Sequence, residues 1–338
     1  MHRLCVIEGD GIGKEVIPAA EQILGAVIPD LVVIPAEAGW ECFQKQGASV
    51  PNVTLQKIKD CGAAIFGAVS SPAKKVNGYR SAIITMRQSL ELFANIRPIR
   101  SLPGISPRLD VNMLIVRENT EGLYAGRERL ENEVAVAERV ISRRASMRIG
   151  LKAVELLRIE NRKRLSIIHK ANILPVTDGL FRDCILEVIS NTKKKDEDWN
   201  VDEILVDTAA MKIISEPQEL DVLVTTNLFG DILSDEAAYW CGGMGLAPSI
   251  NLGDDISLAE PVHGSAPDIA GKGIANPIAA ILSMALLLRY SWKLPQEAER
   301  IETAVRRVLL NELDIQNGRI NPETKTETIT RAILDRLS

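Results

Sequence analysis

The sequence predicts an α/β fold built of two domains. Short runs rich in β-branched residues alternate with longer segments whose apolar residues recur with the period of a helix, and this alternation is typical of α/β proteins. The chain has 338 residues, which is long enough for two domains. Proline and glycine cluster at 98–108 and at 242–253, and we interpret these clusters as two crossings between domains. A middle domain inserted into an outer one explains both crossings.

The predicted elements can be placed in order along the chain. The strand-like runs are rich in valine, isoleucine and leucine and are bounded by turn residues. They lie at 4–9, 31–39, 63–69, 112–119, 164–171, 202–207 and 221–227. Helical periodicity is clearest at 13–27 and 145–159. The charge run at 191–200, "NTKKKDEDWN", predicts a solvated loop, and no internal repeat is visible.

Composition limits the classes of partner. The formal net charge of −5 argues against nucleic acid, because phosphate backbones are bound by basic surfaces. The five cysteines are scattered and never form C-x-x-C, so we expect a reducing compartment, with neither a disulfide framework nor a zinc site. The longest apolar stretch, around "IAAILSMALLL", is too short to span a bilayer, and the N-terminus runs directly into a strand-like segment. We therefore expect a cytoplasmic enzyme or binding protein without a membrane partner.

The stretch "NLFGDILSDEAA" carries a pair of aspartates, Asp231 and Asp235, directly after a strand-like run. In a helix these two side chains point the same way, one turn apart. A bound divalent cation is one reason for two like charges to stand side by side, because Mg²⁺ is held by a few carboxylate oxygens. The alternative is that Asp231 caps or starts the helix while Asp235 is simply solvated.

Two glycine-containing segments are candidates for nucleotide binding. The N-terminal "EGDGIGKE" gives G-x-G-x-G without the third glycine of a Rossmann site, so we predict only a tight strand-to-helix turn there. The better candidate is 259–277, "AEPVHGSAPDIAGKGIANP", where glycines and alanines leave the backbone open to close approach. His263, Asp268 and Asn276 offer side-chain bonds in this segment. Asp268 is expected to accept from the ribose hydroxyls of NAD and to repel the extra phosphate of NADP.

Four motifs together resemble the β-decarboxylating dehydrogenase family. They are "VRENTEGLY", "IHKAN", "NLFGDILSDEAA" and "EPVHGSAPDIAGKGIANP". Members of this family oxidise isocitrate, homoisocitrate, 3-isopropylmalate or tartrate. The resemblance implies the isopropylmalate-dehydrogenase-like α/β fold, which has two domains and is not a Rossmann fold. On this basis we expect a large, NAD-binding domain at 1–98 plus 248–338, and a small domain with the metal ligands and dimer interface at 99–247.

The resemblance also implies roles for particular residues. The family's carboxylate-binding arginines match Arg87, Arg97 and Arg117, whose planar forks suit bidentate bonds to carboxylates. The metal ligands, expected to hold Mg²⁺ or Mn²⁺, match Asp207, Asp231 and Asp235. The family is homodimeric or a higher homo-oligomer with shared active sites, so Asp207 is expected to come from the partner subunit.

The same resemblance assigns the proton carriers and the cofactor contacts. Lys170, also from the partner subunit, matches the lysine that helps to remove the hydroxyl proton, and Tyr124 matches the acid that protonates the enol carbon. Asn172 matches a substrate-site residue near the nicotinamide. The expected NAD contacts are Glu260, His263, Gly264, Ser265, Ala266, Asp268 and Asn276.

The substrate is expected to be a 2-hydroxy di- or tricarboxylic acid whose C3 substituent is recognised just before Arg87. Isocitrate-type relatives carry Ser-x-Asn here; Ser81 fits, but Ile83 replaces the asparagine. Arg80 and Ser81 suit a distal carboxylate, whereas Ile83 and Ile84 suit an isopropyl group.

The segments "GYRSAIITMR" and "GRERLENEVAVAERVISR" look most like homoisocitrate dehydrogenases of the methanogen type, so homoisocitrate is the expected substrate. One departure from aminoadipate-pathway homoisocitrate enzymes is Ile84, where those often carry an arginine. The alternatives are 3-isopropylmalate, isocitrate, or a non-catalytic regulatory subunit. The C-terminal 314–329 departs from the glycine-rich ending common in the family.

Overall fold

The computed structural model describes residues 1–74 and 76–337, and the chain forms two compact units. Unit 1 is made of Met1–Leu92, Ser101–Leu109 and the chain from Ala238 onward, and unit 2 is made of Phe93–Arg100 and Asp110–Ala237. Unit 2 is therefore built from the middle of the sequence, in agreement with the predicted inserted domain. The domain limits given above stay predictions.

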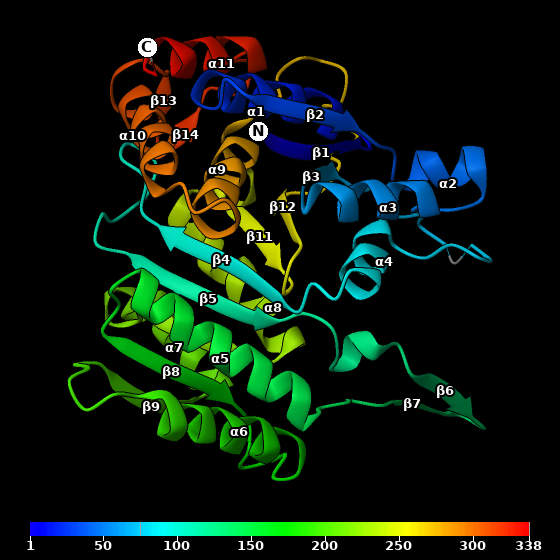
Figure 1. The fold of residues 1–338 in the computed structure, drawn as a ribbon, viewed down its shortest axis with the longest axis vertical. Coiled ribbons are helices and arrows are strands. Elements are labelled where there is room, and N and C mark those ends of the chain that lie inside the picture. The colour runs from blue at the N-terminus through cyan, green and yellow to red at the C-terminus, as the bar shows by residue number, and fades with distance from the viewer. Residues whose placement is uncertain (75, 338) are drawn as a thin grey trace. The chain divides into compact units, whose positions relative to one another are not determined.

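Unit 1 contains a sheet with the strand order β2-β1-β3-β12-β11 (Figure 1). Neighbouring strands are parallel except β11 and β12, which are antiparallel. The strands are β1 (His2–Gly9), β2 (Leu31–Pro35), β3 (Ala63–Ala68), β11 (Pro248–Leu252) and β12 (Ser257–Pro261), with the short hairpin β13 (Ile315–Gln316) and β14 (Arg319–Ile320). The helices are α1 (Gly13–Val27), α2 (Trp40–Gln46), α3 (Asn52–Cys61), α4 (Ala82–Ser89), α9 (Ile278–Leu286), α10 (Pro295–Asn311) and α11 (Thr326–Asp335).

Unit 2 contains a sheet with the strand order β4-β5-β10-β8-β9, in which only β4 and β5 are antiparallel. The strands are β4 (Ala94–Arg100), β5 (Asn112–Glu118), β8 (Arg164–His169), β9 (Asn200–Leu205) and β10 (Val222–Thr225). The helices are α5 (Arg143–Ile159), α6 (Thr177–Thr192), α7 (Val206–Ser215) and α8 (Asn227–Ala237). A separate hairpin of β6 (Glu128–Glu131) and β7 (Val134–Ala137) extends from the body of this unit (Figure 1).

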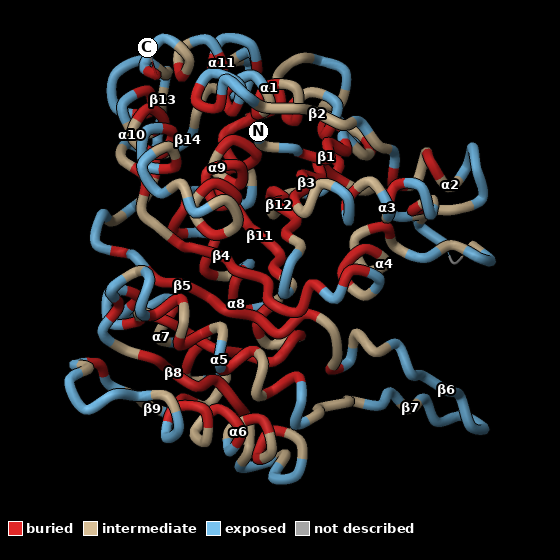
Figure 2. Tube along the Cα trace, viewed as in Figure 1, coloured by how far each residue is buried: buried red, intermediate tan, exposed pale blue. Residues whose placement is uncertain are grey.

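The helices of unit 1 are placed by their apolar faces. The inner face of α1 repeats buried residues at helical spacing and contacts β1, β3, α9 and α11. Helix α9 is buried along almost its whole length, because β11, β12, α1 and α10 surround it (Figure 2). The longest apolar stretch of the sequence is thus core. Within the described residues, no helix combines the length and the apolar character needed to cross a membrane.

Most of the predicted elements are confirmed, with three corrections. The run at 4–9 lies in β1, and the runs at 63–69, 112–119, 164–171 and 221–227 contain β3, β5, β8 and β10. The helical segments 13–27 and 145–159 lie in α1 and α5. The run at 31–39 forms a strand only to Pro35. The run at 202–207 ends as a strand at Leu205, so Asp207 lies in the first turn of α7. The cluster at 242–253, predicted as a crossing, contains the buried strand β11.

The predicted strand-to-helix turn is confirmed between β1 and α1. Gly9 and Gly11 have φ of 74° and 55°, which side chains rarely allow. A Cβ on Gly11 would also lie 2.1 Å from the carbonyl oxygen of Ser265. Asp10, between these glycines, is buried and accepts the backbone N–H groups of Trp40 (2.7 Å), Glu41 (3.0 Å) and Ser70 (2.8 Å). One carboxylate therefore fixes the start of α2 and the segment after β3.

We expect Asp10→Asn to lower the free energy of unfolding by about 2 kcal/mol, because one carboxylate oxygen becomes an amide donor facing N–H groups. Urea denaturation measures this change. The control is Asp60→Asn, which removes an exposed carboxylate that only accepts from Gln56 one helical turn away. Equal stability of the two variants would contradict the role given to Asp10.

Candidate active site

Asp231 and Asp235 lie on α8 and face the same side, one turn apart. Helix α8 begins at Asn227, directly after the buried strand β10. The alternative in which Asp231 caps or starts the helix is therefore wrong. The side chain of Asp231 is 28% exposed and that of Asp235 is 51% exposed, so both carboxylates can be reached from solvent.

Arg97 and Arg117 reach this pair from neighbouring strands. In the antiparallel ladder of β4 and β5, Asn95 stands opposite Arg117, and Arg97 stands opposite Ile115. Residues directly opposite share a face of the sheet, and so do residues two apart along a strand. Both guanidinium groups therefore emerge on one face, although both arginines are buried.

Arg97 binds both aspartates. Its Nη1 donates to Asp235 Oδ1 (2.6 Å) and to the hydroxyl of Ser234 (2.8 Å), and its Nη2 lies 3.5 Å from Asp231 Oδ1. Its Nε donates to Asn95 Oδ1 at 2.8 Å. The guanidinium group is thus held from both sides, and its orientation is fixed.

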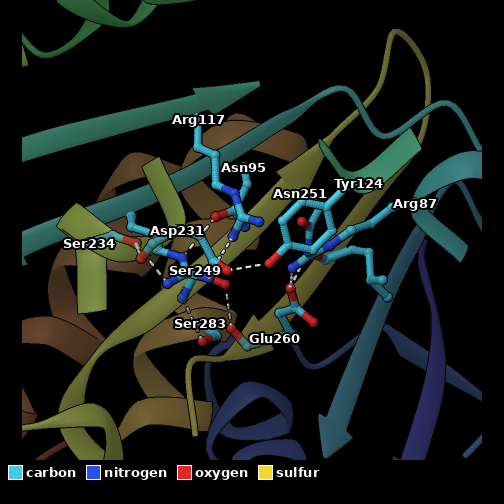
Figure 3. Close-up of polar contacts among 12 residues, drawn as sticks. Arg87, Asn95, Arg117, Tyr124, Asp231, Ser234, Ser249, Asn251, Glu260 and Ser283 are labelled. Atoms are coloured by element: carbon cyan, nitrogen blue, oxygen red, sulfur yellow. Dashed lines mark hydrogen bonds and ion pairs between the residues drawn. The ribbon is translucent and has the colours of Figure 1, made fainter. Parts of the chain in front are cut away.

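Arg117 and Tyr124 complete the cluster around Asp231 (Figure 3). Arg117 forms an ion pair with Asp231 and donates from Nη2 to Asn227 Oδ1 at 2.7 Å. The hydroxyl of Tyr124 donates to the other oxygen of Asp231. Burial raises the pKa of Tyr124 above its usual value, and the hydrogen bond to Asp231 and its charge raise it further.

The charges of this cluster balance, because two carboxylates face two guanidinium groups. Pairing with these two guanidinium groups is thus a second reason, besides a bound cation, for Asp231 and Asp235 to stand side by side. Among the described residues, Asp235 nevertheless accepts only through Oδ1, so Oδ2 is available to a ligand. Carboxylate oxygens are the ligands that Mg²⁺ and Mn²⁺ prefer. Across residues 1–74 and 76–337, no three or more His, Cys, Asp or Glu side chains come together as a metal site.

Lys170 and Asp207, also in unit 2, form an ion pair with each other. Lys170 follows β8, and its backbone N–H donates to the buried Asp178 at 2.7 Å. The hydrogen bond from Lys170 lowers the pKa of the exposed Asp207 carboxyl below its usual value. In the described part of the chain, no hydrogen bond or ion pair joins this pair to Asp231 or Asp235.

Arg87, in unit 1, pairs with Glu260, which the sequence analysis assigned to the cofactor (Figure 3). Glu260 also accepts from Asn251 Nδ2 at 2.9 Å. Arg87 is buried, and its Nε finds no acceptor among the described residues. A buried donor without a partner is costly, so the guanidinium group is ready for a further anionic acceptor.

The segment 262–277 connects β12 to α9 and is fixed at several points. The backbone oxygen of Ser265 accepts from Ile12 N at 2.9 Å, and its hydroxyl bonds to Ser70 at 2.8 Å. Glu15, on α1, accepts from Gly271 N at 2.6 Å. His263 bonds through Nδ1 to its neighbour's carbonyl, while its Nε2 is shielded and has no described partner. Burial lowers the pKa of His263, so the ring is neutral at pH 7.

The other predicted residues are exposed to solvent, stand just before a helix or accept a hydrogen bond from the backbone. Arg80 is exposed and donates to Gln88. Ser81 immediately precedes α4. Asn276 Oδ1 accepts from Ile278 N at 3.0 Å at the start of α9. Gly264, Asp268 and Asn172 are exposed, and Ala266 is half-buried with φ of 39°.

Sequence reasoning missed the amide and hydroxyl groups that orient the arginines. These are Asn95, Asn227 and Ser234. A signal was present, because Asn95 is two residues from Arg97 in a strand, and Asn227 is four residues from Asp231 in a helix. Glu15 was also missed. It lies too far from Gly271 in the sequence for a local pattern to predict their contact.

The carboxylates, buried arginines and tyrosyl hydroxyl in unit 2 make the site of an enzyme that handles an anionic substrate. Residues 3–333 match the model of the isocitrate/isopropylmalate dehydrogenase family. The chain is 50% identical over 336 residues to an isocitrate/homoisocitrate dehydrogenase of Thermus thermophilus, covering 99% of this chain and 98% of the other. It is 50% identical over 326 residues to a homoisocitrate dehydrogenase of Methanocaldococcus jannaschii, covering 92% and 91%.

Among solved structures, an isocitrate dehydrogenase from Methylococcus capsulatus is similar, with a TM-score of 0.92 at 40% identity. The alignment covers 100% of this chain and 99% of that one. The chain therefore belongs to the isocitrate/isopropylmalate dehydrogenase family, and it is an NAD-dependent dehydrogenase of the β-decarboxylating type.

Gly230 on α8 tests how closely this cluster is packed. A Cβ there would lie 2.2 Å from Thr225 Oγ1 and 2.7 Å from Arg117 Cγ, so we expect Gly230→Ala to destabilise the fold by about 1–3 kcal/mol. The control is Gly25→Ala on α1, where a Cβ meets nothing within 4 Å, and this change should stabilise by about 0.5–1 kcal/mol. Urea denaturation compares the two. Similar shifts of the same sign would refute the packing argument.

Proposed function

We propose that the protein carries out the NAD- and Mg²⁺-dependent oxidative decarboxylation of a 3-substituted malate, with homoisocitrate as substrate and a 2-oxoadipate-type acid as product. The observation that carries the proposal is the cluster of Arg97, Arg117 and Tyr124 around Asp231 and Asp235. It offers oxygen ligands for a cation, cationic forks for carboxylates and a hydroxyl that can donate a proton.

In this proposal Asp231 and Asp235 hold Mg²⁺ or Mn²⁺, and Asp207 of a second subunit adds a ligand. When bound, the ion would supply Lewis-acid polarisation at the substrate hydroxyl, and NAD would supply the hydride acceptor. Arg87, Arg97 and Arg117 bind the carboxylates of the malate moiety. The unpartnered Nε of Arg87 supports its part in this role, because a substrate carboxylate would satisfy it.

Asp235→Asn should raise the Mg²⁺ concentration that gives half-maximal activity by about ten-fold or more, because a neutral amide oxygen is a weaker ligand for a hard cation. A Mg²⁺ titration of turnover measures this. Asp183→Asn, which removes an exposed carboxylate on α6, serves as the control. An unchanged Mg²⁺ requirement in Asp235→Asn would refute the ligand assignment.

Tyr124 and Lys170 are the proposed proton carriers. Tyr124 keeps its phenolic proton at neutral pH, since its pKa is raised, and it protonates the enol carbon after loss of CO₂. Lys170 takes the hydroxyl proton at the site of a second subunit. The ion pair of Lys170 with Asp207, without a bond to the Asp231–Asp235 pair of the same chain, supports this sharing.

A homodimer is therefore part of the proposal. Helices α7 and α8 leave large apolar side chains in solvent, with Met211 60%, Ile214 63% and Ile232 58% exposed. Exposed apolar side chains on packed neighbouring helices favour association with another surface of the same kind.

NAD is proposed to bind along 262–277. The unpartnered Nε2 of the neutral His263 suits an adenine amino group, and Gly264 leaves its backbone open. Asn276 is a second proposed adenine contact, and Asp268, which is exposed, is proposed to accept from the ribose hydroxyls. Ser265 and Ala266 in this segment, and Glu260 in β12 just before it, are further proposed contacts of NAD.

The deciding experiment is turnover by the purified chain alone. We expect NADH to form, with Mg²⁺ present, fastest from homoisocitrate among homoisocitrate, 3-isopropylmalate and isocitrate, and more slowly when NADP replaces NAD. Absorbance of the reduced nicotinamide follows the reaction. Absence of turnover with every acid would favour a non-catalytic subunit, and equal use of NADP would refute the role of Asp268.

A second candidate substrate is 3-isopropylmalate, and one observation favours it. Ile83 and Ile84 are half-buried on α4, one turn before Arg87, so they lie near its face of the helix. Arg80, by contrast, is exposed and bonded to Gln88. An aliphatic C3 group would pack against the isoleucines, whereas a distal carboxylate requires Arg80 to leave Gln88.

Arg80→Ala separates the two substrates. If Arg80 binds the distal carboxylate of homoisocitrate, its loss should lower kcat/KM for that acid by about ten-fold or more and leave 3-isopropylmalate unaffected. Arg87→Ala is the control and should impair both acids. If Arg80→Ala stays within about two-fold of the unaltered enzyme on homoisocitrate, the isoleucines set the specificity instead.

A further inference from the structure

Unit 1 contains a second cavity that shares no residue with the candidate active site. It has a volume of 610 Å³ and lies among α10, the turn Leu287–Ser291 that follows α9, and the end of α11. Four arginines line it, and the single acidic lining residue is Glu299. The arginines are Arg289, Arg300, Arg307 and Arg336.

One face of α10 supplies most of this wall. Gln296, Arg300, Thr303 and Arg307 follow one another at spacings of four, three and four residues, which places them along one side of the helix. The opposite side carries the buried apolar residues that pack into the core. Arg300 and Arg307 are seven residues apart, which corresponds to about 10 Å along the helix axis.

Two of the four arginines are already neutralised. Arg289 pairs with Glu302 at 2.9 Å and with Glu299 at 3.5 Å. Arg336 pairs with Glu312 at 2.5 Å. Glu299 is shared, because it also binds Arg306, at 2.6 Å.

Arg300 and Arg307 remain without a counter-charge among the described residues. Arg300 donates only to the carbonyl oxygen of Leu337, at 3.1 Å, and no side-chain hydrogen bond or ion pair is formed by Arg307 within 1–74 and 76–337. Both guanidinium groups belong to exposed residues that line the same cavity. A concave basic surface concentrates anions from solution.

We infer that this cavity binds a small polyanion bearing two or more phosphate groups. Guanidinium forks bind phosphate oxygens in pairs, and the separation of Arg300 from Arg307 requires a ligand longer than a single phosphate. Pro295, Ala304 and Leu337 add an apolar wall that can contact an uncharged body, as in a nucleoside di- or triphosphate. This site goes beyond the proposed catalytic function.

Calorimetric titration with tripolyphosphate in Mg²⁺-free buffer tests the inference on the full chain. The double variant Arg300→Ala/Arg307→Ala should weaken binding by about ten-fold or more. The matched control is Arg331→Ala, which removes the same charge from α11, where Arg331 is 71% exposed and paired with Glu327 one turn away. It should bind like the unaltered protein.

Inorganic phosphate provides the second arm. It should bind about ten-fold more weakly than tripolyphosphate, because it meets one arginine at a time. Equal affinity of both probes, or equal loss in Arg331→Ala, would overturn the inference, as would absence of tripolyphosphate binding. Arg307→Gln removes the charge but keeps a polar side chain, and it should weaken binding even if the double variant proves unstable. Because binding is measured without substrate or NAD, failure here is distinguishable from failure of the proposed reaction.

Discussion

The burial of two guanidinium groups on adjacent strands is the constraint that organises unit 2. A cation removed from water must be surrounded by acceptors. Arg97 obtains acceptors from its own strand and from α8, and Arg117 obtains acceptors from α8. The register of the two strands determines where the acceptors must lie. Helix α8 places Asn227, Asp231 and Asp235 one turn apart, where they bind the two guanidinium groups. The close approach of α8 to β5 in turn requires a residue without a side chain at Gly230. The strand pairing, the position of α8 and the chemistry of the site therefore all follow from the need to neutralise these two buried cations.

Much of the fold could be predicted from the sequence, and the omissions share a cause. Strands β1, β3, β5 and β10 each contain an unbroken run of three or more buried apolar residues, and the run in β8 is broken only by Ser166, so the apolar pattern reveals them. Strands β4 and β11 are equally buried, yet they carry Asn95, Arg97, Ser249 and Asn251 inside. A pattern that equates burial with apolar character cannot recognise such strands. The polar residues that concealed them are the ones that hold Arg97 and Glu260 in position.

The sequence predicted which residues belong to the candidate site better than it predicted which side chains bind each other. The family resemblance singled out Arg97, Arg117, Tyr124, Asp231 and Asp235, and the structure brings these five together. The partner of each side chain was harder to predict, because it depends on strand register and helix packing. Glu260, which stays a predicted cofactor contact, also forms an ion pair with Arg87 that no motif indicated. The spacing of Asp231 and Asp235 likewise does not indicate that arginines neutralise them.

The bond from Gly271 to Glu15 joins residues separated by 256 positions, and it has a consequence for synthesis on the ribosome. Helix α1 also packs against α9 and α11, which come late in the chain. The part of the apolar face of α1 that α9 and α11 cover therefore stays open while unit 2 is translated. During that interval the nascent chain is exposed to aggregation and is a target for chaperones. Slowed translation after 237 would prolong this period, because the two helices that complete the cover of α1 lie beyond that position.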